Sequence, residues 1–196
     1  MADAFDPQHA PRLEDPARLE ALPRATVVSL LRLDGAETVV DYGSGTGTYT
    51  VAVAEAVPHG RVIAVEALPR LAEMLRDKIT PELAERLEIM ETDANVVPTA
   101  DSVADRVLMV DVLHHLYDQP GALTEVVRLL RPGGLFVVVD WSDRERPVGP
   151  PLNHVLGLAA VRAIIAEMGL EEIEAHEPGT ELPYHLVVVA EKRQPA

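Results

Sequence analysis

The sequence carries a glycine loop beside an acidic residue, an arrangement suited to binding a nucleoside. Residues 39–47 read V-V-D-Y-G-S-G-T-G, so glycine occupies three alternate positions directly after an apolar run. Glycine has no Cβ, so the backbone of such a turn can approach ligand atoms closely. The alternative is a tight strand–helix turn that needs glycine only for its dihedral angles.

The spacing separates this loop from two common phosphate-binding loops. The dinucleotide pattern G-x-G-x-x-G needs a third glycine where this chain has Thr48, and Gly47 comes one residue too early. No G-K-[ST] follows, which excludes a nucleoside-triphosphate loop. A nicotinamide-dependent oxidoreductase therefore stays only as a less favoured alternative.

Two further acids follow the next two apolar runs. Glu66 closes the run 61–66, where a carboxylate can accept hydrogen bonds from both hydroxyls of a ribose. Asp93 comes just after the run 87–91, and its carboxylate could accept a bond from an exocyclic amine. Either acid alone could be a solvated loop carboxylate. Three such features at the ends of three successive strands favour one shared nucleoside site.

The elements that must position these residues alternate between strand and helix. Strands are expected at 38–42, 61–66, 87–91, 105–111, 135–140, 170–176 and 185–191, and helices at 24–33, 48–57, 68–79, about 118–130 and 153–168. This order predicts an α/β fold: a doubly wound, mostly parallel, Rossmann-like sheet with helices on both faces. No helix joins the last two strands, so the final strand is expected to be antiparallel.

The domain organisation follows from the prolines near the start of the chain. Residues 1–24 are polar and proline-containing, and they are expected to form a partly flexible N-terminal arm that caps the site, with a short helix near 15–22. Residues 25–196 are expected to form a single domain.

Composition excludes several functions. The formal net charge of −15 repels phosphate backbones, so no nucleic-acid partner is expected. The absence of Cys excludes disulfides, cysteine zinc sites and a cysteine nucleophile, and no metal site is predicted. The first residues do not resemble a signal peptide, and no apolar run approaches the roughly 20 residues of a membrane span. We expect a cytoplasmic protein that does not bind membranes.

In their order and spacing, the motifs resemble the class I S-adenosylmethionine-dependent methyltransferases, particularly the type-11, ubiquinone-biosynthesis-like branch that acts on small molecules. The resemblance covers about residues 25–192 and rests on V-V-D-Y-G-S-G-T-G, V-I-A-V-E-A, E-T-D-A, D-R-V-L-M-V-D-V-L-H-H-L and L-R-P-G-G-L-F-V-V-V-D. It implies a seven-stranded sheet with a reversed last strand. It also implies S-adenosylmethionine as cofactor and a small-molecule acceptor methylated by in-line displacement.

The resemblance implies roles by position. The cofactor-binding residues would be Asp41, Gly43, Gly45, Gly47, Glu66, Ala67, Asp93, Ala94, Asp111 and Val112. Within this set the glycine loop would cradle the methionyl group, Asp41 would orient its ammonium and Glu66 would hold the ribose. Asp93 and the Ala94 amide would bind the adenine. The backbone at the end of the fourth strand would contact the methionyl amine.

Candidates for acid–base work lie after the fourth and fifth strands. A base is needed only where the acceptor must lose a proton. His114 and His115 are the first candidates because imidazole titrates near neutral pH, although either ring could simply hold a loop in place. Further candidates are Asp111, Tyr117, Asp140, Trp141 and His154. Arg144 and Arg146 could meet an anionic acceptor or could be solvated loop charges.

Two further questions stay open at this stage. The fourth strand lacks a following Asn/Asp-Pro-Pro-Tyr, which the resemblance associates with planar amide or adenine nitrogens, so those acceptors are disfavoured. The short arm leaves room for a second chain to complete the pocket. A non-catalytic S-adenosylmethionine-binding subunit that needs a partner chain is therefore the main alternative, and the sequence also leaves a homodimer open.

Overall fold

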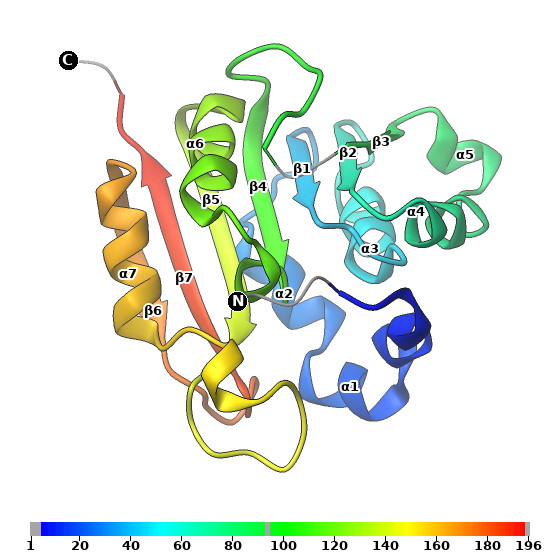
Figure 1. Ribbon diagram of the computed structural model, residues 1–196. Coiled ribbons are helices and arrows are strands. Elements are labelled where there is room, and N and C mark those ends of the chain that lie inside the picture. Colours follow the sequence, from blue (N-terminus) through cyan, green and yellow to red (C-terminus); the bar gives the residue numbers. More distant parts are fainter. Residues whose placement is uncertain (1–4, 93–94, 195–196) are drawn as a thin grey trace.

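Seven strands form one mixed sheet in the order β3-β2-β1-β4-β5-β7-β6 (Figure 1). The computed structural model describes residues 5–92 and 95–194. The strands are β1 (Thr38–Tyr42), β2 (Arg61–Glu66), β3 (Leu87–Glu91), β4 (Ala104–Val110), β5 (Leu130–Trp141), β6 (Leu170–His176) and β7 (His185–Lys192). In this order, neighbouring strands from β3 through β2, β1 and β4 to β5 pair in parallel, whereas β7 runs antiparallel to both β5 and β6. The predicted fold class, with its reversed last strand, is confirmed.

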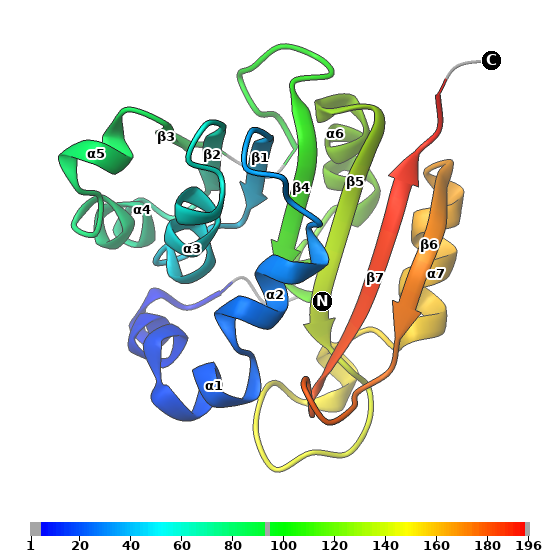
Figure 2. The same ribbon diagram turned by 180° about the vertical axis from the view of Figure 1, so that it is seen from behind.

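Helices cover both faces of this sheet and make two separate apolar cores. The helices are α2 (Arg24–Leu30), α3 (Thr48–Ala56), α4 (Pro69–Arg76), α5 (Pro81–Ala84), α6 (Gln119–Leu129) and α7 (Leu158–Glu167). Val126 of α6 and Val161 of α7 belong to one core, and Val53 of α3 and Leu75 of α4 belong to the other. Figures 1 and 2 show α6 and α7 on one face and α2 and α3 on the opposite face.

Several helix boundaries differ from the sequence-based expectations. Helix α2 ends at Leu30 because Arg32 takes the left-handed conformation, with φ of 51°. Beyond α4 the chain continues in tighter turns, in which Lys78 and Ile79 donate to carbonyls three residues back. The helix expected at 153–168 begins only at Leu158, after a 3₁₀ turn η3 (Leu152–His154) and an extended residue, Val155.

Within its described part, residues 5–24, the N-terminal arm is largely helical. It contains the 3₁₀ helix η1 (Pro7–Glu14) and helix α1 (Pro16–Ala21). Asp6 and Asp15 cap these two helices, each accepting a bond from a backbone N–H two residues on. The arm lies under the carboxyl ends of the parallel strands (Figure 1).

Within residues 5–92 and 95–194, none of the helices combines the length and the apolar character that crossing a bilayer would require.

Candidate functional site

The carboxyl ends of the parallel strands, the N-terminal arm and the loop after β5 meet at one edge of the sheet (Figure 1). Asp41 and Glu66 lie in the ends of β1 and β2, and Asp111 follows β4. Asp140 lies at the end of β5, and the reversed direction of β7 adds its first residue, His185, to the same edge. The fold therefore gathers ionisable side chains from five strands at this edge.

The glycine loop is shaped by both packing and backbone conformation. Gly43, Gly45 and Gly47 have φ of 81°, 56° and 85°, a region that side chains disfavour. A Cβ on Gly43 would lie 2.4 Å from Val112 Cγ2, and one on Gly47 would lie 2.2 Å from Leu75 Cδ1. A Cβ on Gly45 would meet only Leu13 of the arm, at 3.3 Å. Gly43 and Gly47 are thus required by packing, and Gly45 presents its backbone toward the arm.

Asp41 and Glu66 are two buried acids beside this loop. Glu66 accepts hydrogen bonds from the Gly45 N–H (2.7 Å) and the Leu68 N–H (2.9 Å), each on a different carboxylate oxygen. Asp41 accepts a bond from Thr50 Oγ1 (2.5 Å). Burial, with the nearby Glu66 charge, raises the pKa of Asp41 to about 6, and burial also raises the pKa of Glu66. Among the described residues neither acid has a Lys or Arg partner, so a cation here would stabilise both.

The other predicted cofactor residues divide into three groups. Ala67 follows Glu66 and is exposed, and Val112 is half-buried against Gly43. Asp93 and Ala94, the expected adenine contacts, lie outside the described residues. Asp111 is only slightly exposed, with 10% of its side chain accessible, and it has φ of 56°, a left-handed conformation that is uncommon outside glycine. The structure thus brings the described members of this set to one edge.

Asp111 is the centre of a second charged cluster. Its Oδ2 accepts a bond from Arg18 of the arm (2.9 Å), and its Oδ1 lies 3.1 Å from His185 Nε2 without hydrogen-bond geometry. Burial alone would raise the pKa of Asp111, but the His185 ring and the Arg18 guanidinium outweigh it and hold that pKa below its usual range. This carboxylate is therefore ionised.

His114 and His115 lie side by side in the 3₁₀ helix η2 (Leu113–His115), with ring centres 4.0 Å apart. Asp140 accepts bonds from both His114 Nδ1 (2.6 Å) and the His114 backbone N–H (3.2 Å). Burial alone would lower the pKa of His114, but the Asp140 and Asp111 carboxylates outweigh it and raise that pKa. His115 is half-buried and packs edge-on against Phe5, with ring centres 5.7 Å apart.

The remaining acceptor-side candidates have different surroundings. Tyr117 is 90% exposed, and His154 lies in η3. Arg146 donates to the carbonyls of Ser142, Arg144 and Pro150. Its guanidinium also lies over the Trp141 ring, 5.2 Å from the ring centre. Arg146 therefore holds its own loop together, while its Nε is buried without a hydrogen-bond partner in the described chain.

Two residues at this edge carry no role in the sequence-based prediction. Arg18 lies in a short helix of the arm, and its sequence neighbourhood gives no signal of a site. His185 packs against Trp141 with ring centres 4.3 Å apart, and both of its ring nitrogens are buried without a hydrogen-bond partner in the described chain. The available signal was the polar His185 directly before five apolar residues, 186–190.

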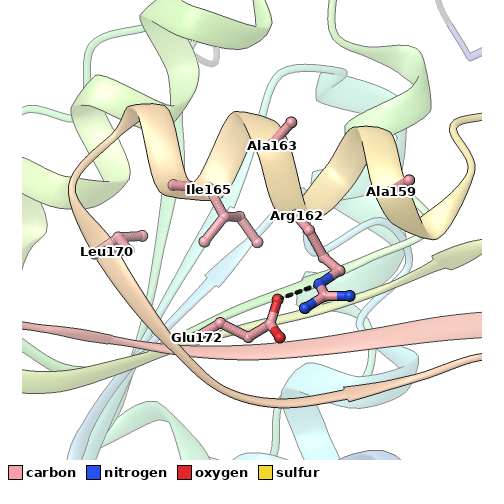
Figure 3. Close-up of a pocket in the computed structure, with 7 residues that line it drawn as sticks. Ala159, Arg162, Ala163, Ile165, Leu170 and Glu172 are labelled. Carbon is pink, nitrogen blue, oxygen red and sulfur yellow. Dashed lines mark hydrogen bonds and ion pairs between the residues drawn. The ribbon is translucent and has the colours of Figure 1, made fainter.

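A groove between α7 and β6 lies on the opposite half of the sheet from the glycine loop. It is lined by Ala159, Arg162, Ala163, Ile165, Ala166, Leu170 and Glu172. Figure 3 shows the Arg162–Glu172 ion pair (2.7 Å) spanning from helix to strand. Apart from this ion pair the residues that line the groove are apolar, and none of them offers a nucleophile or a buried ionisable group. The carboxyl edge is therefore the candidate site.

Comparison with known proteins gives one consistent family. Residues 40–138 match the family described as "Methyltransferase domain". A demethylmenaquinone methyltransferase of Lactiplantibacillus plantarum is 29% identical over 131 residues, which are 66% of this chain and 55% of the relative. This chain thus spans about half the length of that relative.

Two solved structures extend the likeness beyond the matched segment. A SAM-dependent methyltransferase from Aquifex aeolicus is 27% identical with a TM-score of 0.88, covering 96% of this chain and 99% of that one. A geranyl diphosphate methyltransferase solved in complex with SAM has a TM-score of 0.74 at 15% identity, covering 97% of this chain and 92% of that one. The second likeness concerns the fold alone.

Proposed function

We propose, from the premise that this chain belongs to the methyltransferase domain family, that it transfers a methyl group from S-adenosylmethionine to a small-molecule acceptor. The observation that carries this proposal is the pair of buried acids, Asp41 and Glu66, beside a glycine loop with an approachable backbone. Two carboxylates without a basic partner among the described side chains suit a ligand with sulfonium and ammonium groups.

The residues of the carboxyl edge fit this cofactor. Glu66 uses one lone pair of each oxygen to hold Gly45 and Leu68, so both oxygens can still accept bonds from ribose hydroxyls. The Asp41 carboxylate would favour the positive charge of the cofactor, and the positive-φ glycines would leave room for the methionyl chain. In the same proposal, Ala67 and Val112 line the site, and Asp93 with Ala94 binds the adenine.

Methyl transfer requires only that the residues around the acceptor position it and, where needed, take up its proton. S-adenosylmethionine supplies a methyl group already activated on a sulfonium, ready for in-line displacement. The protein's contribution is to align the acceptor and exclude water. The His114 ring is fixed by Asp140 and can hold a proton released by a hydroxyl or acidic carbon acceptor. His115 packs beside that ring and shapes the same wall.

An acceptor screen tests the proposal. The full chain is incubated with S-adenosylmethionine and a panel of phenols, naphthoquinols, amines and carboxylic acids, and formation of S-adenosylhomocysteine is measured. Naphthoquinols are included because of the name of the relative from Lactiplantibacillus plantarum. We expect turnover with a hydroxylated acceptor and its loss in Glu66→Ala. Cofactor binding without turnover on any acceptor would instead favour a binding subunit that needs a partner chain.

A further inference from the structure

Arg18 links the N-terminal arm to the buried edge of the sheet. Its guanidinium donates to the Leu13 carbonyl (3.0 Å) and to Asp111 Oδ2 (2.9 Å), and lies 5.6 Å from the centre of the Tyr49 ring. Only 14% of the Arg18 side chain is exposed. A short helix at the chain's start thus delivers a nearly buried positive charge to the end of β4.

The groups around this ion pair are not fully satisfied by the protein. Ser44 Oγ is buried without a hydrogen-bond partner in the described part of the chain, and Asp111 Oδ1 makes no hydrogen bond there, although it lies 3.1 Å from His185 Nε2. Asp111 also has φ of 56°, a left-handed conformation that aspartate adopts more readily than most residues other than glycine. Buried polar atoms normally have partners, so orphaned atoms on two facing segments indicate a ligand that supplies them.

The same segments enclose the part of the glycine loop that faces the arm. A Cβ on Gly45 would meet Leu13, which precedes Arg18 in the arm and receives one of its hydrogen bonds. A Cβ on Gly43 would meet Val112, the neighbour of Asp111. Glu14 fixes the arm here by accepting bonds from Thr46 (2.5 Å) and Thr48 (2.6 Å). The arm, the loop and the end of β4 therefore converge on one small region.

Opposite charges held 2.9 Å apart are complementary to an α-amino acid, whose ammonium and carboxylate share one carbon atom. We propose that Arg18 binds the α-carboxylate of the cofactor's methionyl group while the Asp111 carboxylate receives its α-ammonium. This inference rests on the proposed function, because it concerns the cofactor of that reaction. The guanidinium keeps further N–H donors beyond its two bonds. An amino acid zwitterion has no net charge, so its insertion leaves no uncompensated charge in the site.

The proposal predicts that the protein distinguishes S-adenosylmethionine from decarboxylated S-adenosylmethionine, which differs only by the missing carboxylate. Calorimetric titrations of the full chain with both ligands are compared for the wild type, Arg18→Met and Arg18→Lys. Methionine keeps the apolar stem over Tyr49 and removes the charge. Arg12→Met is the matched control, because Arg12 lies on the same arm and is exposed.

We expect Arg18→Met to weaken S-adenosylmethionine binding about tenfold to a hundredfold, the scale of a lost charged hydrogen bond. Its affinity for the decarboxylated ligand stays within about threefold of the wild type. Arg18→Lys keeps the charge and recovers part of the difference between the two ligands, and Arg12→Met behaves as the wild type. If Arg18→Met does not fold, the test compares the wild type with Arg18→Lys. The ratio of the affinity for S-adenosylmethionine to that for the decarboxylated ligand should then be smaller in Arg18→Lys.

Three results would overturn the inference while leaving the proposed function intact. They are equal affinity of the wild type for both ligands, an equal loss for both ligands in Arg18→Met, and unchanged S-adenosylmethionine binding in that variant. An equal loss would mean that Arg18 only supports the structure of the arm. Absence of binding of either ligand to the wild type would instead contradict the proposed function itself.

Discussion

At the scale of single residues, the protonation of buried acids and histidines determines what the candidate site can bind. Asp41 and Glu66 are removed from water next to the glycine loop, and Asp41 has a pKa of about 6. Below about pH 6 the ligand-free chain therefore holds a proton on Asp41 that a cationic ligand would displace. For His114 the balance is different. Burial alone would lower its pKa, but two nearby carboxylates favour its charged form and raise that pKa.

The raised pKa of Asp41 predicts proton release on cofactor binding. Near pH 6 the free chain holds about half a proton on Asp41, and a bound cation favours the ionised form. The observed binding enthalpy should therefore depend on the ionisation enthalpy of the buffer at pH 6 and much less at pH 8. Asp41→Asn should release fewer protons, whereas Glu88→Gln, an exposed acid on β3, should match the wild type. Equal release from all three proteins would contradict the assignment.

The Asp140–His114 pair predicts a shift in histidine titration. Because the Asp140 carboxylate stabilises the charged ring, Asp140→Asn should lower the pKa of His114, which NMR of the ring protons measures directly. In the wild type this pair stabilises the fold fully below pH about 6.5, and the contribution is lost as pH rises through the raised pKa of His114. Asp143→Asn, at an exposed position in the loop that follows β5, serves as control. An unmoved midpoint in Asp140→Asn would refute the coupling.

At the scale of elements, the turn between β1 and α3 shows why glycine is required at position 47. Gly47 has φ of 85°, and a Cβ there would lie 2.2 Å from Cδ1 of Leu75, a side chain with no exposed surface. Neither the backbone nor Leu75 can move without disturbing the core between α3, α4 and the sheet. The loop conformation is thus fixed by helix packing as much as by any ligand.

Gly47→Ala should therefore destabilise the protein more than Gly169→Ala. Both positions have positive φ, but a Cβ on Gly169 would meet nothing within 4 Å. We expect a loss of about 1 kcal/mol in the free energy of unfolding for Gly169→Ala, from the left-handed conformation alone. Gly47→Ala adds overpacking of about 1–3 kcal/mol. Urea denaturation measures both, and equal losses would show that Leu75 yields freely.

The sequence predicts elements well where pattern and local chemistry agree. The apolar runs and the missing last crossover helix suffice for the sheet and its reversed strand. The start of α7 at Leu158 could not be predicted, because the preceding 3₁₀ turn keeps an apolar pattern compatible with a helix. In the site, Asp41 and Glu66 were found because they end strands. Arg18 was missed because only tertiary packing brings α1 to β4.

At the scale of the whole molecule, strand order is what makes a site from distant segments. The order β3-β2-β1-β4-β5-β7-β6 puts β1 beside β4, so the glycine loop and Asp111 become neighbours although about 65 residues separate them. The arm then adds Arg18 to Asp111 across 93 residues of sequence. Most of the acidic side chains behind the net charge of −15 lie at the surface, whereas only a few acids lie at the carboxyl edge where the cofactor is proposed to bind.

Calorimetric titration of the full chain with S-adenosylmethionine, beside parallel titrations with S-adenosylhomocysteine and NADH, tests the central claim most directly. The account predicts saturable binding of S-adenosylmethionine at one site per chain and no binding of NADH. It also predicts that Glu66→Ala weakens binding of S-adenosylmethionine by about 1–3 kcal/mol, the loss of charged hydrogen bonds. Binding of NADH with no heat from either S-adenosyl compound would contradict it.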